Sequence, residues 1–213
     1  ASGQSCVAGS RLYLHNSIAD EFLERMLAVT ATIRIGAPLA EATQMGPLAT
    51  LAQIEHIERQ VALAQEQSGT VLSGGKRPQT PNQGWFYEPT IIACPDQKMT
   101  IVDTELFGPV LSVLRFDDED EVTALANDSK FGLAAGVFTQ NGARAMRMTK
   151  ALRAGIVWVN TYRVVSPIAE FGGYKESGYG RESGMQAIYD YTRPKTAWIN
   201  ISDEAMANPF VMR

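Results

Sequence analysis

The chain has 213 residues, 45% of them hydrophobic and 20% charged, which is enough for one substantial hydrophobic core. Its net charge of −4 offers no basic field for nucleic acid, and no segment approaches the roughly 20 apolar residues of a membrane-spanning helix. Two cysteines without metal-ligand spacing fit a reducing cytoplasm better than a disulfide framework. We therefore expect one soluble, cytoplasmic domain without a nucleic-acid, membrane or metal partner.

Near the start of the chain, the thiol of Cys6 lies among small residues, in the stretch from Gly3 to Arg11. A thiolate is a strong nucleophile, and its fraction rises when backbone N–H groups or a helix N-terminus face the sulfur. We predict a short helical turn over Val7–Arg11 whose amides point back at Cys6. On this stretch alone, Cys6 is equally well explained as a small, inert hydrophobic residue.

Hydrophobic periodicity predicts the elements of the first half of the chain. They are a strand at 12–14, a helix from an N-cap at Ser17 to about Arg34, a helix at 51–67 and a strand at 70–72. The first helix should bury an apolar stripe made of Ile18, Phe22, Met26 and Val29. His15 and His56 have no ligand spacing, so neither is expected to be catalytic.

The second half alternates strands with helices. We predict strands at 90–93, 110–116, 133–139 and 155–159, and helices at 119–127 and 143–152. This alternation is typical of an α/β fold with a mainly parallel, twisted sheet and flanking helices. Cys94 ends a strand with nothing nearby to activate its sulfur, so we interpret it as structural. Asn160 follows the last of these strands, where ligands collect in such sheets.

The end of the chain should contain a helix at 183–191 and an exposed strand over Lys195–Ile201. An exposed strand tends to pair with another chain. The residues after Ser202 have no periodic signal.

Four stretches occur in an order that is characteristic of one family: 3–11, 104–110, 155–160 and 171–182. With them, the chain from Cys6 to about Asn200 resembles the catalytic domain of the NAD(P)-dependent aldehyde dehydrogenases. The resemblance implies that Cys6 is the nucleophile and that Glu182 relays protons. It also implies that Glu105 binds the nicotinamide ribose and that Phe107 packs against the nicotinamide.

The resemblance further makes 161–170 the loop that anchors the substrate. The substrate-binding residues that it implies are Ser5, Val7, Asn160, Val164, Val165 and Ser166. Glu170 is a departure, since a proline usually precedes the Phe-Gly-Gly sequence in this family. Valines and a serine in the loop, in place of bulkier side chains, suggest a wide aldehyde pocket.

On this interpretation the chain oxidises an aldehyde to a carboxylic acid through a cysteine thiohemiacetal and thioester. Residues 1–191 would be the thiol-bearing catalytic domain, truncated at its N-terminus. Residues 192–203 would be an oligomerisation strand that builds a homodimer or homotetramer, and 204–213 a tail. NAD or NADP would be held mainly by a domain upstream of this sequence.

Two alternatives stay open. A cysteine hydrolase or acyltransferase would need a histidine near Cys6 and an acid to orient it. An inactive assembly module would keep the fold without using the thiol.

Overall fold

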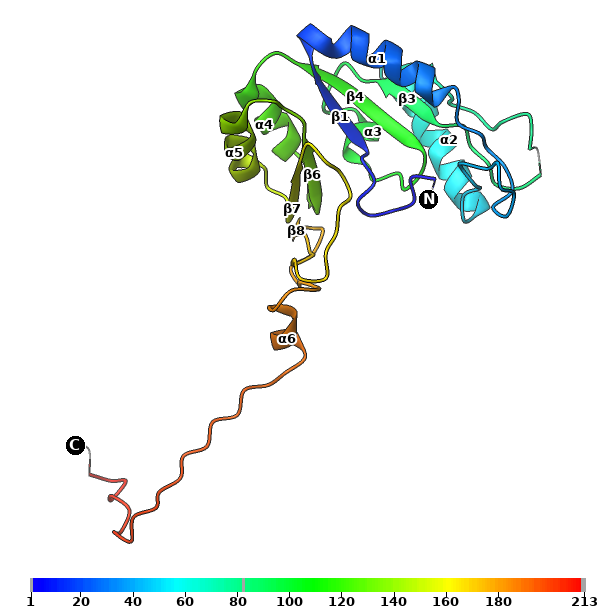
Figure 1. Cartoon of the computed structure of the whole chain (residues 1–213). Coiled ribbons are helices and arrows are strands. Elements are labelled where there is room, and N and C mark those ends of the chain that lie inside the picture. Colours follow the sequence, from blue (N-terminus) through cyan, green and yellow to red (C-terminus); the bar gives the residue numbers. More distant parts are fainter. Residues whose placement is uncertain (1, 82, 212–213) are drawn as a thin grey trace.

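A four-stranded sheet organises the first half of the chain in the computed structural model, which describes residues 2–81 and 83–211 (Figure 1). Its strand order is β1–β4–β3–β2. The strands are β1 (Arg11–His15), β2 (Thr70–Ser73), β3 (Thr90–Ala93) and β4 (Val110–Phe116). β4 pairs in parallel with β1 and β3, whereas β2 pairs antiparallel with β3.

Helices cover both faces of this sheet, because neighbouring residues of a strand point to opposite faces. On one face, Ile92 packs in a core with α2 (Leu51–Glu66) and α3 (Thr100–Asp103). On the other face, Ile91 packs against α1 (Asn16–Thr30). Each face therefore has its own hydrophobic core.

The second half forms a smaller α/β unit. Its elements are α4 (Glu119–Asn127), β5 (Phe131–Gly132), β6 (Ala134–Val137), α5 (Gly142–Ala151), β7 (Ile156–Val159), β8 (Tyr174–Lys175) and α6 (Ala187–Asp190). β6 and β7 pair in parallel, and β5 and β8 pair antiparallel. Val122, Met148 and Leu152 form the core between α4, α5 and the strands β6 and β7.

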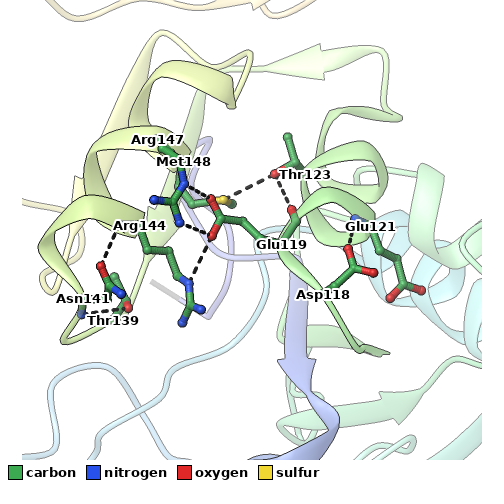
Figure 2. Close-up of polar contacts among 9 residues, drawn as sticks. All are labelled: Asp118, Glu119, Glu121, Thr123, Thr139, Asn141, Arg144, Arg147 and Met148. Atoms are coloured by element: carbon green, nitrogen blue, oxygen red, sulfur yellow. Dashed lines mark hydrogen bonds and ion pairs between the residues drawn. The ribbon is translucent and has the colours of Figure 1, made fainter.

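An acidic side chain links α4 to α5 (Figure 2). Arg147 donates two hydrogen bonds of 2.7 Å to the Glu119 carboxylate, and Arg144 donates a third of 3.2 Å. These contacts hold the pKa of Glu119 below its usual range, chiefly through the hydrogen bond from Arg147. The link therefore fixes α5, and through it β7, against α4.

The α/β class, the parallel pairing and most predicted elements are confirmed. The exception among the long elements is α1, which begins one residue before Ser17 and ends at Thr30, short of Arg34. Its cap is the side chain of His15, which accepts from the Ser17 N–H at 3.2 Å. The predicted apolar stripe is wrong in part, because the face of the helix that packs on the sheet carries Ala19 and Leu23, with Met26 beside them. Ile18, Phe22 and Val29 are exposed.

Other differences come from short or unpartnered segments. The strand expected at 133–139 is shortened to β6, and the short β5 before it, α3 and β8 were not predicted. The helix expected at 183–191 is reduced to the single turn of α6. Residues 195–201 form no strand among the described residues; they extend away from the body of the chain (Figure 1). A strand needs a partner for its hydrogen bonds, and this segment contacts none here.

We predict that Glu119→Gln reduces the sensitivity of the fold to acid. A carboxyl pKa lowered by folding contributes stability above its unfolded value, about 4.5, and that contribution is lost as the pH falls through the folded value. The free energy of unfolding, measured in urea at neutral pH and below pH 4.5, should therefore drop less in the variant. Glu24→Gln is the control, because Glu24 is exposed and makes no ion pair within the described residues. An equal drop in both variants would contradict the prediction.

Candidate functional site

Cys6 lies in a tight turn that precedes β1. The turn spans Ser5 to Ala8 and is closed by a 2.9 Å hydrogen bond from the Ala8 N–H to the Ser5 carbonyl. Cys6 is at its centre and is exposed. The predicted helical turn over Val7–Arg11 is wrong, because the Ser10 carbonyl already accepts from the Ser112 N–H of β4 at 3.0 Å. Chain that pairs with a sheet is extended and cannot be helical at the same time.

Side-chain hydrogen bonds attach the segment before Cys6 to the loop that precedes α2. The Ser2 hydroxyl donates to the Gly46 carbonyl at 2.8 Å, and the Gln4 side-chain oxygen accepts from the Ala49 N–H at 3.1 Å. Gly3, which has a φ of 72°, lies so close to Gly108 that an added Cβ would be 2.0 Å from the Gly108 carbonyl oxygen. Only glycine allows this approach, and it brings the Cys6 segment against the loop at 104–109.

This loop carries the two predicted cofactor-binding residues. Glu105 is exposed, and Phe107 is 39% exposed with a φ of 54°. Between them, Leu106 is buried and anchors the loop. Gln53 of α2 donates to the backbone carbonyls of Leu106 and Phe107, the latter at 3.1 Å. Because β1 and β4 are parallel, the segments that precede them lie at the same edge of the sheet, so Glu105 and Cys6 come from adjacent segments.

Asn160 fixes the ends of two strands of the smaller unit. It has a φ of 53°. Its side-chain oxygen accepts from the Thr139 N–H at 2.8 Å, and its side-chain nitrogen donates to the Thr139 carbonyl at 2.9 Å. The amide group thus joins the end of β7 to the segment after β6. Its polar atoms already have partners in this chain.

The loop at 161–170 is exposed at the positions predicted to bind substrate. Val164 and Val165 are 61% and 67% exposed, and Ser166 is also exposed. The Trp158 indole N–H donates to the Val164 carbonyl at 2.8 Å. Sequence reasoning missed Tyr162, whose hydroxyl donates to the Val7 carbonyl at 3.1 Å. The only available signal was an aromatic residue just after the β7 strand, in a segment already interpreted as a substrate loop.

The glycine-rich stretch at 171–182 is fastened to the smaller unit. The Lys175 ammonium donates to the Asn127 carbonyl at the end of α4, at 2.7 Å, and to the Ser129 carbonyl just after it, at 2.8 Å. Desolvation lowers the pKa of Lys175. Phe171 and Glu182 exchange two backbone hydrogen bonds of 2.7 Å, and the Glu182 side chain is exposed. The stretch therefore forms a closed loop with Glu182 at its base.

The second thiol and the first histidine lie in different surroundings. Cys94 is 6% exposed, and burial raises the pKa of its thiol, which agrees with a structural role. The His15 Nδ1 lies 2.8 Å from the Ser17 hydroxyl, and the ring packs edge-on against Phe116. His15 is therefore engaged at the start of α1, which gives no support to a cysteine hydrolase.

An open depression of about 600 Å³ borders the Cys6 segment. It is lined by Ser2, Gln4, Pro38, Thr43, Gln44, Gly46, Pro47, Leu48 and Ala49. Over residues 2–81 and 83–211, no cluster of three or more histidine, cysteine or acidic side chains could hold a metal ion. No helix in that part of the chain has the length and apolar character to cross a bilayer.

Known proteins resemble this chain along its whole length. It is 50% identical over 214 residues to the (Z)-2-((N-methylformamido)methylene)-5-hydroxybutyrolactone dehydrogenase of Acinetobacter baylyi. The match covers all of this chain and 43% of that protein. It is 44% identical to a betaine aldehyde dehydrogenase of Brucella melitensis, over 94% of this chain and 42% of that protein. The chain therefore spans less than half the length of these curated relatives.

A solved structure shares the fold. PnpE from Pseudomonas sp. WBC-3, in its complex with nicotinamide adenine dinucleotide, superimposes with a TM-score of 0.93 at 44% identity. The match covers 98% of this chain and 43% of PnpE. The family model described as "Aldehyde dehydrogenase family" matches residues 1–197. The chain belongs to the aldehyde dehydrogenase family.

Proposed function

We propose that this chain supplies the nucleophile and the substrate loop of an enzyme that oxidises an aldehyde to a carboxylic acid with NAD(P). The observation that carries the proposal is an exposed Cys6 at the centre of a turn held by segments on several sides. The Cys6 thiolate adds to the aldehyde carbon and forms a thiohemiacetal. Loss of a hydride from that carbon leaves a thioester on Cys6, and water cleaves it to the carboxylic acid and the free thiol.

The oxygen of the attacked aldehyde becomes negatively charged and needs a hydrogen-bond donor. The Cys6 N–H is available for this, because within the described residues it makes no hydrogen bond. The Ala8 N–H, two residues further on, already donates to the Ser5 carbonyl and closes the turn. Cys6 therefore offers both the nucleophile, through its side-chain sulfur, and one donor for the oxyanion, through its backbone N–H.

Glu105 and Phe107 fit the nicotinamide end of the cofactor. An exposed carboxylate can accept hydrogen bonds from two ribose hydroxyls, and a half-exposed aromatic ring offers a surface for a flat ring. Both lie on the loop whose Gly108 touches the segment of Cys6. When bound there, NAD(P) supplies the acceptor for the hydride. The remainder of the cofactor would be held by a part of the whole protein that this chain, which covers 43% of its relative's length, does not include.

The remaining site residues keep the roles that the family resemblance implies. Ser5 and Val7 flank the nucleophile, and Val164, Val165 and Ser166 present exposed positions to a substrate. Asn160 would act by holding the loop in place, because Thr139 occupies its amide group. Glu182 would relay protons during thioester hydrolysis.

We also propose a homodimer or homotetramer built through residues 192–203, with 1–191 as the catalytic domain and 204–213 as a tail. The support is a row of large, exposed side chains in an extended segment. Trp198, Ile199 and Ile201 are 94%, 81% and 94% exposed. Pairing of this segment with a strand of another copy would give its backbone N–H and C=O groups hydrogen-bond partners and cover this apolar surface.

Cys6 should be alkylated before Cys94. A limiting amount of iodoacetamide, followed by peptide mapping, should label Cys6 first, because alkylation needs an accessible thiolate and Cys94 is buried with a raised pKa. Labelling after unfolding in urea is the control and should affect both thiols alike. Faster labelling of Cys94 in the folded chain would contradict the nucleophile assignment.

Glu105→Gln should impair hydride transfer in the whole protein without changing the fold. A charge-assisted hydrogen bond contributes about 1.5–3 kcal/mol, so loss of one should slow single-turnover formation of reduced cofactor by roughly ten- to a hundredfold. Glu24→Gln, an exposed glutamate on α1, is the matched control. If both variants react like the unchanged protein, Glu105 is only a solvated loop acid.

The tail segment should control association. Light scattering of the 213-residue chain should show oligomers, because the exposed segment around Trp198 and Ile199 seeks a partner. Replacing both residues by serine should lower the molar mass. Tyr179→Ser removes an equally exposed aromatic ring outside the segment and should leave the mass unchanged. A monomeric wild-type chain would exclude the proposed role.

A further inference from the structure

We propose that Tyr162 is a positioning residue for Cys6: its hydroxyl clamps the nucleophile turn to the substrate loop. The inference rests on the proposed role of Cys6 as nucleophile. It starts from one contact, the 3.1 Å hydrogen bond from the Tyr162 hydroxyl to the Val7 carbonyl, between residues 155 positions apart. Val7 directly follows Cys6 inside the turn.

The base of the clamp is rigid. Asn160, two residues earlier, is tied on both sides of its amide group to Thr139. The Tyr162 ring meets the Trp158 ring edge-on, with centroids 5.0 Å apart and planes at 66°. Trp158 is 6% exposed and also holds the Val164 carbonyl. The tyrosine is thus fixed to the end of β7 before it reaches the turn.

Two glycines make room for this side chain. A Cβ on Gly136 of β6 would lie 2.9 Å from the Tyr162 ring, and a Cβ on Gly9 would lie 3.3 Å from its hydroxyl oxygen. The first distance is too short for any side chain, and the second is tighter than normal packing. The ring therefore lies between β6 of the smaller unit and the chain just after Cys6.

The hydroxyl is a permanent donor at neutral pH. Burial raises the pKa of Tyr162 above its ordinary value of 10.0, despite the nearby charge of Arg163. A protonated phenol donates to the Val7 carbonyl throughout the physiological range. The turn is closed by the hydrogen bond from the Ala8 N–H to the Ser5 carbonyl, and the Ser5 N–H donates to the Gly3 carbonyl. The Tyr162 hydroxyl adds a hydrogen bond that connects the turn to the smaller unit.

The first test uses the 213-residue chain and the exchange of the Ala8 N–H with deuterium, which reports opening of the turn. Tyr162→Phe removes only the hydroxyl, and it should lower protection of Ala8 by roughly two- to tenfold, the worth of one neutral hydrogen bond. Tyr179→Phe, at a fully exposed ring, should change nothing. Unchanged protection in Tyr162→Phe overturns the inference, because ring packing alone would survive this substitution.

A double-mutant cycle tests the same contact from the other side. Gly9→Ala should also loosen the turn, since its methyl group crowds the hydroxyl. In the Tyr162→Phe background it should have less than a twofold effect, because the nearest remaining ring atom is 3.8 Å away. Additive effects of the two substitutions would contradict a shared contact.

The second test separates positioning from a merely structural role. In the whole protein, Tyr162→Phe should lower kcat for aldehyde oxidation by about three- to tenfold, since the rate of hydride transfer depends steeply on the placement of the reacting atoms. The iodoacetamide rate of the exposed Cys6 should stay within twofold, and Cys94 should remain unlabelled. Loss of Ala8 protection with unchanged kcat overturns the positioning role. A wild-type protein that oxidises no aldehyde would instead refute the proposed function, while the exchange data would still report the contact itself.

Discussion

The proposed site depends on how an exposed turn with little apolar contact is kept in one place. Cys6 is exposed and belongs to none of the hydrophobic cores of the described residues, so its position is set by polar contacts and close backbone approach. Ser2 and Gln4 attach the preceding segment to the loop before α2. Gly3 packs on Gly108 before β4, and Tyr162 holds the following residue from the smaller unit. Hydrogen bonds of this kind each contribute about 0.5–1.5 kcal/mol, and together they define the turn.

The sheet explains why these groups meet. β1 and β4 are parallel neighbours, so the chain that enters β1 and the chain that enters β4 lie at the same edge. The first carries Cys6 and the second carries Glu105. The smaller unit contributes Asn160 and Tyr162 from the carboxyl end of β7. In the proposed site, the general rule that ligands collect at the carboxyl ends of parallel strands would therefore apply only to the smaller unit.

The sequence predicted long elements well, because periodicity over seven or more residues reflects burial directly. β4 and α4 are found at the predicted residues. The face of α1 was wrong because Ile18 and Phe22 resemble core residues by composition, while the small Ala19 is what fits against the sheet. Residues 195–201 form no strand, because no other segment among the described residues pairs with them.

The candidate site was predictable only in part. Motifs predicted Cys6 and Glu105 as site residues, and the structure shows that they come from adjacent segments. The turn geometry around Cys6 was not predictable, because the pairing of Ser10 with Ser112 is a contact over a long sequence separation. Tyr162 was missed for the same reason. A hydrogen bond between residues 7 and 162 has no local signature, and one tyrosine in a loop is ordinary.

If Cys6 is the nucleophile, it carries the substrate as a thioester during turnover. Rapid acid quenching of the whole protein during steady-state oxidation of an aldehyde, followed by peptide mapping, would detect that thioester. We predict an acyl group in thioester linkage on the Cys6 peptide, present only when both NAD(P) and aldehyde are added. An acyl group on Cys94, or continued turnover with Cys6 unmodified at every quench time, would contradict it.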